Sequence, residues 1–198
     1  MRYGEEHKAK TRDKVLKAAA KAIRADGPHR VGVAGLMSKA GLTHGGFYAH
    51  FPSKDALIAA AIEQMFAESR ERFLRETENR EPADALANYI DFYLSARHRD
   101  AVGDGCPISS LAGDVRRVSK HARKCFAGGA ARLSARLADS LRALGNGDPD
   151  GTASSMLAEM VGALTLSRGE PDPARSDSIL AASRAALKRR LGLRENPS

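Results

Sequence analysis

Five side chains that can donate hydrogen bonds to a phosphate or a base edge lie close together in the first third of the chain. They combine hydroxyl, imidazole and ammonium groups and are Thr43, His44, Tyr48, His50 and Lys54. Donors of this kind suit contact with a polyanion, above all beside a helix N-terminus, which exposes N–H groups and the positive end of the helix dipole. The segment therefore predicts phosphate and base contact rather than catalysis.

Two short helices are predicted around these donors. We expect the first over residues 33–40, ending at Gly41, where a tight turn between helices needs positive φ. Thr43 is a natural N-cap for the second helix, which should run to about His50. This is the layout of a helix-turn-helix, whose second helix enters the major groove of DNA by its N-terminal end.

The charge of the chain is concentrated in the same region. The 198 residues carry a net charge of +8, from 32 basic and 24 acidic side chains. Residues 1–54 hold eleven of the basic and four of the acidic residues, a net charge of +7, whereas the remainder holds 21 and 20. This asymmetry favours an N-terminal segment that meets a nucleic acid, and a basic solvated surface is the alternative.

Residues 12–58 resemble the DNA-binding domain of the TetR family of bacterial transcriptional regulators. The similarity is carried by residues 40–57, AGLTHGGFYAHFPSKDAL. The family pattern there is roughly Ala-Gly-Val, Ser or Thr, any residue, Gly, two variable residues, Tyr, any residue, His or Tyr, and Phe. A helix start of the form Ser-Lys-acid-x-Leu follows it. The chain departs from the pattern at Gly32, where a Ser or Thr cap is usual, and at Gly46, where a side chain often touches a base.

The resemblance implies a DNA-binding role for eight residues. They are Lys39, Thr43, His44, Gly45, Gly46, Tyr48, His50 and Lys54. Gly45 would let the backbone approach DNA closely, and Lys54 would bind a phosphate at the N-terminus of the next helix. For Tyr48 and His50, packing between helices is the alternative to contact with DNA, whereas Phe47 and Phe51 are expected in the core.

Helical periodicity dominates the whole chain and predicts an all-α fold of at most nine helices. The expected helices cover about 8–26, 33–40, 43–50, 53–77, 83–99, 107–115, 118–144, 151–168 and 174–191. We expect a three-helix DNA-binding domain with the helix-turn-helix over residues 1–54. A larger helical domain for effector binding and dimerisation would follow over residues 55–198.

The resemblance also implies that the last two helices pair with those of a second copy. The apolar residues expected at this dimer interface are Met156, Met160, Leu164, Ile179, Ala182 and Ala186. Helix faces suggest an effector pocket lined by Tyr89, Phe92, Tyr93, Leu111, Phe126 and Met160. An ordinary core within one chain is the alternative for both sets.

Cys106 is a candidate thiol sensor. It precedes Pro107, which favours the first position of a helix, so the thiol would stand near a helix N-terminus that stabilises thiolate, with Arg116 or Arg117 adding to the effect. Residues 105–112 resemble a glycine-cysteine motif of one TetR subgroup, some members of which sense electrophiles or oxidants. The alternative is a small buried residue at a helix start, and Cys125 is expected in the core.

Other kinds of site are not predicted. Two cysteines exclude a disulfide scaffold and a zinc site of cysteines alone, and His121 with Cys125 lacks a third ligand, so no metal and no cofactor is expected. The charged N-terminus and the absence of a long apolar run indicate a cytoplasmic protein that does not bind membranes.

The sequence is thus interpreted as a transcriptional regulator without enzymatic activity. The leading hypothesis is a homodimeric repressor that binds a palindromic operator in double-stranded DNA and is released by a small-molecule or electrophile effector. One alternative is a helical ligand-binding carrier or enzyme with an incidental helix-turn-helix. Another is an architectural DNA-binding protein that needs no ligand.

Overall fold

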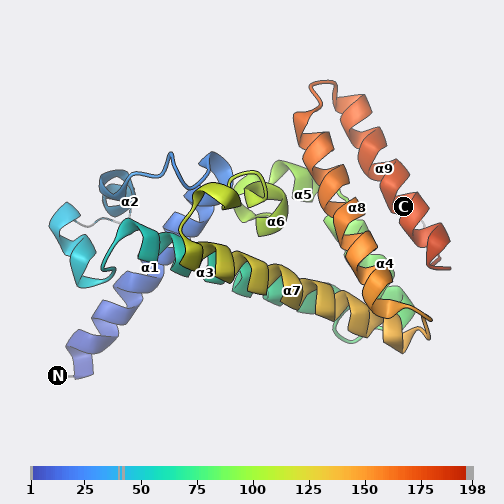
Figure 1. Cartoon of the computed structure of the whole chain (residues 1–198), viewed down its shortest axis with the longest axis horizontal. Helices are drawn as coiled ribbons and strands as arrows, with labels where there is room; N and C mark the ends of the chain where they lie inside the picture. The colour runs from blue at the N-terminus through green and yellow to red at the C-terminus, as the bar shows by residue number, and fades with distance from the viewer. Residues whose placement is uncertain (1, 40, 42, 195–198) are drawn as a thin grey trace. The chain divides into compact units, whose positions relative to one another are not determined.

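The computed structural model describes residues 2–39, 41 and 43–194, and this part of the chain is helical without strands, as the periodicity predicts. The elements in Figure 1 are α1 (Arg2–Asp26), α2 (Val33–Lys39), the 3-10 helix η1 (His44–Ala49), α3 (Lys54–Thr77), α4 (Pro82–Tyr93), α5 (Ala96–Asp100), η2 (Val102–Asp104), α6 (Pro107–Leu111), η3 (Val115–Arg117), α7 (Lys120–Ala143), α8 (Pro149–Gly169) and α9 (Pro173–Arg190).

The chain forms two compact units, each built from two segments. Unit 1 contains residues 1–68 and 106–129, and unit 2 contains residues 69–105 and 130–198. Unit 1 holds 16 basic and 8 acidic side chains, whereas unit 2 holds 16 of each, so the net charge of +8 belongs entirely to unit 1. The predicted functional boundary between residues 54 and 55 falls at the first turn of α3, whose N-terminal part packs in unit 1.

Helix α1 forms because its apolar residues recur at helical spacing and meet the core of unit 1. The buried stripe consists of Val15, Leu16, Ala19, Ala20 and Ile23. The helix ends at Gly27, as predicted, since this glycine adopts φ of +83° and donates its N–H to the Ile23 carbonyl. The helix begins at Arg2 rather than near residue 8.

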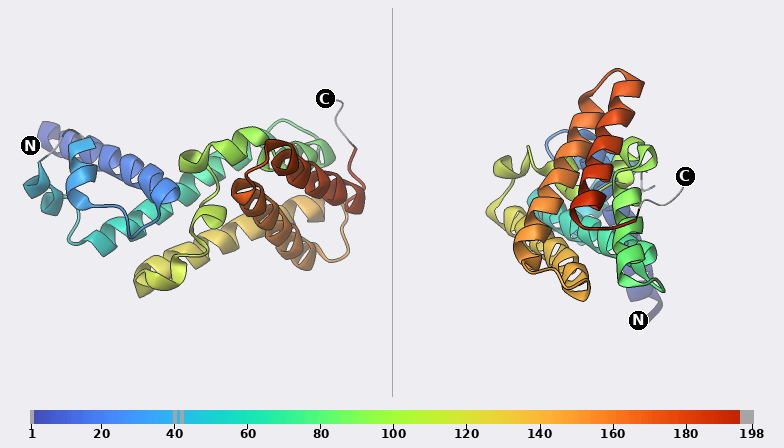
Figure 2. Two further views of the ribbon diagram at one scale, coloured as in Figure 1. Left: turned by 90° about the horizontal axis from the view of Figure 1, so that it is seen from above. Right: turned by 90° about the vertical axis from the view of Figure 1, so that its right-hand side faces the viewer.

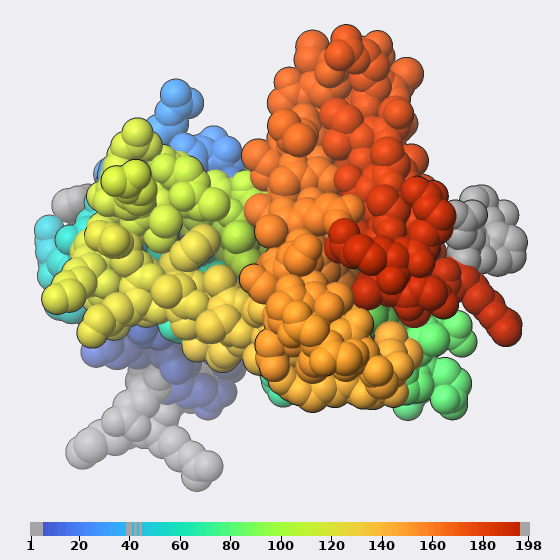
Figure 3. All heavy atoms as spheres, turned by 45° about the vertical axis from the view of Figure 1, so that its right-hand side comes forward, coloured from blue at the N-terminus to red at the C-terminus, as the bar shows by residue number. Residues whose placement is uncertain are grey.

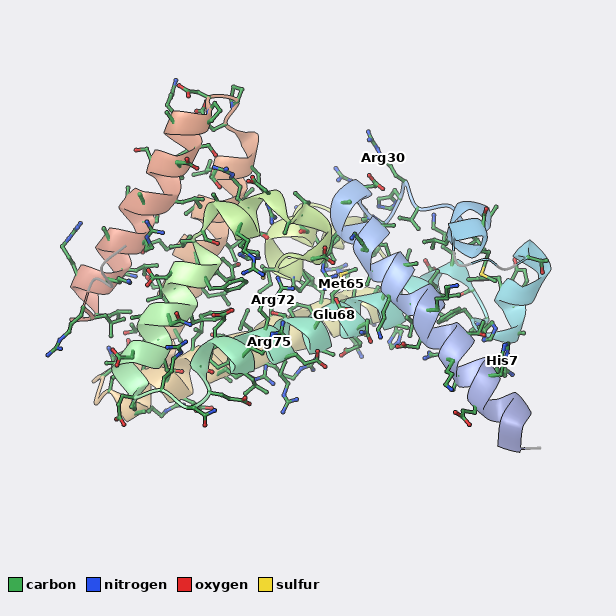
Figure 4. The ribbon with its side chains drawn as sticks, turned by 180° about the vertical axis from the view of Figure 1, so that it is seen from behind. His7, Arg30, Met65, Glu68, Arg72 and Arg75 are labelled. Carbon is green, nitrogen blue, oxygen red and sulfur yellow. The ribbon has the colours of Figure 1, made fainter. Side chains whose placement is uncertain are left out.

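Arg24 changes the interpretation of the N-terminal charge. Its guanidinium is buried, donates to a Glu68 carboxylate oxygen at 2.6 Å and reaches the Met65 carbonyl at 3.3 Å. Figure 4 labels Met65 and Glu68 where α3 passes the C-terminal part of α1. Arg24 therefore contributes to the core of unit 1 and not to its basic surface, unlike Arg30, which points away from the fold.

Helix α7 lies against α3 in unit 1 because one position has no side chain. A Cβ atom at Gly129 would stand 2.1 Å from the Phe66 ring, so only glycine lets this ring reach the α7 backbone. Phe66 also packs edge to face on Phe126, with ring centroids 5.9 Å apart.

The single helix expected over residues 83–99 is two helices, α4 and α5, in unit 2. The Ser95 hydroxyl ends the first by donating to the Phe92 carbonyl at 2.7 Å, and it caps the second by accepting from the His98 N–H at 3.1 Å. The His98 ring then closes the break, since Nδ1 lies 2.8 Å from the Tyr93 carbonyl. A serine side chain can form hydrogen bonds with the backbone that interrupt a helix. The spacing of apolar residues does not reveal such bonds, so it predicted one continuous helix.

Helices α8 and α9 form an antiparallel hairpin in unit 2 and lie side by side in Figures 1 and 2. Each begins at an aspartate that caps it, Asp148 for α8 and Asp172 for α9. The C-terminal part of α9 is held to α4 by Lys188, which is buried and lies 2.6 Å from an Asp91 oxygen. No helix among the described residues has both the length and the apolar character needed to cross a bilayer.

Candidate nucleic-acid interface

The turn between α2 and η1 has the geometry that the sequence predicts for a helix-turn-helix. Gly41 adopts φ of +73° and donates its N–H to the Ser38 carbonyl at 2.9 Å. Gly32 stands at the cap of α2, where its carbonyl accepts the Leu36 N–H at 3.1 Å without help from a side chain. The chain thus leaves α2 and enters the next helix within four residues.

The second helix of the motif is a 3-10 helix, η1, rather than the expected α-helix. Thr43 occupies its N-cap position in an extended conformation, but the hydroxyl makes no capping hydrogen bond. The Thr43 carbonyl instead accepts the Gly46 N–H at 3.1 Å, which is the shorter 3-10 step. Two successive glycines lower the preference for an α-helix, and this lowering accounts for the tighter turn.

Two phenylalanines anchor η1 to unit 1. Phe47 and Phe51 are buried, as expected, with stacked rings whose centroids are 5.8 Å apart. The guanidinium of Arg12 lies over the Phe51 ring at 5.0 Å from its centroid, so α1 contacts the same aromatic pair. These anchors hold the opposite face of η1 towards solvent.

The predicted donors occupy that outer face to different degrees. Tyr48 is 66% exposed and packs edge to face on the Phe47 ring, so most of its side chain faces solvent. Thr43 is exposed as well. His50 is half-buried, and its Nδ1 is buried without a hydrogen-bond partner among the described residues. Packing, which was the alternative for both rings, thus applies more to His50 than to Tyr48.

Lys54 is half-buried in the first turn of α3, next to a capped helix N-terminus. The cap is Ser53, at the start of the helix expected over residues 53–77, and its hydroxyl accepts the Ala56 N–H at 3.1 Å. Lys39 and His44 lie in helical backbone, but their side chains are outside the described part of the structure.

Neither glycine at the centre of η1 is required by the fold. A Cβ atom at Gly45 would meet nothing within 4 Å, and one at Gly46 would make ordinary contacts at 3.6 and 3.8 Å. Neither residue has positive φ, in contrast to Gly41. Any physical need for a bare backbone at Gly45 and Gly46 must therefore come from a partner outside the chain.

Two basic residues of α1 join this surface and were not singled out from the sequence. Arg12 is exposed above Phe51, and the Lys14 ammonium lies 3.9 Å from the position of a Cβ atom at Gly41. Their positions on the exposed side of α1, opposite the buried stripe, are the sequence signal that could have found them. Together with the donors of η1 and Lys54 they form a surface able to contact phosphates.

The residues predicted for the dimer interface divide into two groups. Met156, Met160 and Leu164 are completely buried within one chain, so they belong to the core of unit 2 and offer no surface to a second copy. Ile179 and Ala186 are half-buried and Ala182 is exposed. Periodicity identified the apolar face of α8 correctly but did not show which neighbour covers it.

The residues predicted for the effector pocket are distributed over both units. Leu111 and Phe126 belong to unit 1, whereas Tyr89, Phe92, Tyr93 and Met160 belong to unit 2. Tyr89, Tyr93, Leu111 and Met160 are buried, and Phe92 and Phe126 are half-buried. Their role in effector binding stays a prediction.

Cys106 stands at the N-cap of α6, where the sequence places it, and is buried in unit 1. The thiol makes no capping hydrogen bond, and the Cys106 carbonyl accepts the Ser109 hydroxyl at 3.0 Å. Arg116 and Arg117 are both exposed, and Arg117 pairs with Asp114 at 3.3 Å. Within the described residues, no group of three or more His, Cys, Asp or Glu side chains could hold a metal ion.

Comparison with known proteins agrees with this geometry. A family described as "Bacterial regulatory proteins, tetR family" matches residues 15–61, which include α2, η1 and the start of α3. The chain is 27% identical over 93 residues to the uncharacterized HTH-type transcriptional regulator YvdT of Bacillus subtilis (strain 168). That match covers 46% of this chain and 48% of YvdT, so the chain spans about half the length of this curated relative.

Solved structures share the fold over nearly the whole chain. The reduced form of NemR from E. coli has a TM-score of 0.80 at 22% identity, covering 96% of this chain and 99% of NemR. A TetR transcriptional regulator from Chloroflexus aurantiacus J-10-FL has a TM-score of 0.79 at 23% identity, with 97% of each chain covered.

Proposed function

We propose that the chain is a member of the TetR family of bacterial regulatory proteins and that it regulates transcription by binding double-stranded DNA. The observation that carries the proposal is the arrangement of η1. Phe47 of η1 and Phe51 just after it are buried, whereas Tyr48 and Thr43 face solvent on the unit that holds the entire net charge. Rigid anchors on one face and donors on the other are what a recognition helix needs.

The phosphate contacts come from the ends of the motif. Lys54 at the start of α3, with Arg12 and Lys14 on α1, supplies positive charge, and the capped N-terminus of α3 adds its dipole. Such contacts orient the protein on the duplex, while the start of η1 reads base edges.

Selective binding further requires two copies of the motif, because one short helix contacts few bases. We propose a homodimer on a palindromic operator, with half-sites about 34–36 Å apart or at a multiple of this spacing. The apolar surface available on α8 consists of Leu166, which is 66% exposed, and the half-buried Leu157 and Val161. Ala182 on α9 is exposed too, so these residues, rather than Met156, Met160 and Leu164, would meet the second copy.

An effector would release the operator by favouring a state in which the two recognition helices no longer fit successive grooves. The required coupling free energy is typically about 1–3 kcal/mol. A small molecule or an electrophile that reacts with Cys106 could act in this way in a cytoplasmic repressor. Because Cys106 is buried, the structure around it would have to open before an electrophile reaches the thiol. Cys106→Ser should bind DNA normally yet fail to respond to electrophiles, and normal release by this variant would remove the thiol from the mechanism.

A gel-shift experiment against the DNA that flanks the protein's own gene tests the function. The intact protein should bind with a large preference over random DNA, and Tyr48→Ala should reduce affinity on the order of tenfold, which corresponds to about 1.4 kcal/mol. Arg97→Gln is the matched control, because Arg97 is exposed on unit 2 and has no ion pair among the described residues.

Three results would contradict parts of the proposal. Equal affinity for the flanking DNA and random DNA would indicate an architectural protein. No binding to either would favour a carrier or an enzyme with an incidental helix-turn-helix. A one-to-one complex with a single half-site would exclude the dimer.

A further inference from the structure

A second group of cations lies on unit 1, outside the helix-turn-helix. It consists of Arg116, Arg117, Lys120, Arg123 and Lys124, which we call the α7 basic patch. All five side chains are exposed, and Asp114 is the one acidic residue in segment 114–124. In Figure 3, where this segment is yellow-green to yellow, it lies on the surface and is not covered by other elements in that view.

The fold holds three of these cations on one side of α7. Lys120, Arg123 and Lys124 follow the spacing i, i+3 and i+4, so they share one helix face. Ala122 is completely buried on the opposite side, and its N–H is capped by the Ser119 hydroxyl at 3.3 Å. The direction of the charged face is therefore set by the core of unit 1.

Four of the five cations are not neutralised. Arg117 pairs with Asp114 at 3.3 Å, but among the described residues no acid pairs with Arg116, Lys120, Arg123 or Lys124. Some exposed cations of unit 2 are neutralised instead, for example Arg142, which pairs with both Asp139 and Asp150. The patch therefore leaves a local excess of positive charge at the surface.

This arrangement also opposes the stability of α7. The positive end of a helix dipole favours acidic residues in the first turn, and α3, α4 and α8 carry Asp55, Asp84 and Asp150 there. Helix α7 has no acid in its first turn and instead begins with Lys120, followed by Arg123. Helix α9 also lacks an acid in its first turn but is capped by the Asp172 carboxylate. A local departure from the stabilising pattern indicates a role outside folding.

We propose that the α7 basic patch is a second DNA-contacting surface, which binds phosphates without reading sequence. It belongs to the compact unit that carries the helix-turn-helix, and the start of η3 lies beside the end of α1, since the Asp114 Oδ2 atom lies 3.1 Å from the position of a Cβ atom at Gly27. The inference rests on the proposed function and adds phosphate binding that the recognition motif does not supply.

The composition of the patch favours DNA over an acidic protein. Protein interfaces have an apolar core with aromatic residues at the centre, whereas contact with nucleic acid depends on Lys and Arg at exposed positions. No large apolar side chain among the described residues is exposed beside the patch, because Tyr48 and Leu166 are the exposed ones and lie elsewhere.

The test compares two sets of four neutralising substitutions in the full chain. The patch variant is Arg116→Gln, Lys120→Gln, Arg123→Gln and Lys124→Gln. The control is Arg80→Gln, Arg97→Gln, Arg189→Gln and Arg194→Gln, which removes the same charge from exposed residues of unit 2 that have no ion pair among the described residues. Binding to a random-sequence duplex of several helical turns is followed by fluorescence anisotropy between about 50 and 200 mM salt.

We expect the patch variant to bind more weakly than the control at low salt. Its plot of log affinity against log salt should be shallower, by about 0.9 for each phosphate that the variant no longer binds. Its thermal midpoint should equal or exceed that of the unmodified chain, since the substitutions remove charges that oppose the dipole of α7. The decrease in affinity should be the same for random DNA and for a specific operator.

A patch variant with the salt slope of the unmodified chain, or a control whose slope decreases as much, would overturn the inference and leave the proposed function intact. A decrease in affinity confined to one sequence would also overturn it, because binding to phosphates cannot select bases. An unmodified chain that binds no DNA would instead refute the proposed function, and the second surface with it.

Discussion

The two units contain equal numbers of basic side chains and use them in different ways. In unit 2 the 16 cations are matched by 16 acids, and pairs such as Arg142–Asp150 at 2.6 Å and Arg190–Glu159 at 2.9 Å join different elements. In unit 1, exposed pairs such as Lys10–Glu6 at 2.8 Å join residues one turn apart on α1. Exposed pairs of this kind add little stability, so unit 1 keeps an excess of positive charge suited to the proposed contact with DNA, whereas the charges of unit 2 balance in sum.

Both units contain a buried cation paired with an acid, and breaking this pair should have the largest effect on the free energy of unfolding. Each unit buries one cation against a partly exposed acid, Arg24 against Glu68 and Lys188 against Asp91, with 2.6 Å between the charged atoms. Glu68→Ala and Asp91→Ala should each lower the free energy of unfolding by about 3 kcal/mol, because the cation remains buried without its partner. Urea denaturation measures this loss.

The double variant Arg24→Met with Glu68→Leu provides the control. It should recover most of the stability, since removing both charges leaves no buried ion without a partner. A loss below about 1 kcal/mol in either single variant would mean that its pair behaves like an exposed ion pair.

The second prediction compares two glycines whose replacement creates close contacts. A Cβ atom would stand 2.1 Å from the Phe66 ring at Gly129 in unit 1, and 2.2 Å from the Asp148 carboxylate at Gly151 in unit 2. Gly129→Ala should cost about 3 kcal/mol, because an aromatic ring inside a packed core cannot move aside easily. Gly151→Ala should cost about 1 kcal/mol, since a surface carboxylate can rotate away and forfeits only its cap. Equal losses in thermal denaturation would contradict this distinction.

The third prediction concerns His98, the one histidine of unit 2. The pKa of this ring is lowered to about 4, mainly by burial. The hydrogen bond to the Tyr93 carbonyl raises the pKa, whereas the nearby charges of Arg168 and Arg72 lower it. The unfolded chain binds the proton more readily, so stability should fall by about 2 kcal/mol as the pH decreases from about 7 to 5. Denaturation at several pH values, with His98→Gln as the reference, isolates this contribution, and an unchanged pH dependence in the variant would refute it.

The smallest effect on folding is expected at Gly45. Gly45→Ala should change the free energy of unfolding by no more than about 1 kcal/mol, and in the stabilising direction, because nothing surrounds the new methyl group and alanine favours helices. Gly41→Ala should destabilise unit 1, since φ is +73° there. If DNA approaches the backbone at Gly45, Gly45→Ala should still weaken DNA binding. Full affinity in this variant would show that the glycine is not needed for binding.

Much of the fold could be predicted from periodicity and helix signals. Helix ends and caps depend on hydrogen bonds between residues a few positions apart. This applies to the ends of α1 at Gly27 and of α2 at Gly41, and to the caps at Gly32 and Ser53. The described residues form nine α-helices, the number that was predicted as the maximum. The numbers agree because one additional α-helix and one missing α-helix cancel in the count. Residues 83–99 form two helices, and the second helix of the motif is the 3-10 helix η1.

For the candidate functional residues, the sequence predicted exposure and burial correctly on η1 but not on α8. Exposure of Tyr48 and burial of Phe47 agree with the family pattern, because they follow from a helix with one anchored face. The burial of Met156 on α8 did not follow, since a broad apolar face fits a core and an interface equally well. Composition counts Arg24 with the other cations of residues 1–54, since it does not show that Glu68 faces this side chain across 44 residues of sequence.

The sequence alone determined the helical class, the helix-turn-helix and its donors, because helix caps, glycine turns and periodic apolar residues act over a few neighbouring positions. Only the tertiary structure decided which cations beyond residue 54 share a unit with residues 1–54. It brought residues 106–129 into the same unit as residues 1–68, and so assigned the cations of η3 and α7 to the unit that holds the helix-turn-helix and left unit 2 neutral. Long-range packing sets these neighbours, since helices distant in the sequence meet through side chains such as Phe66 and positions such as Gly129 that no local pattern connects.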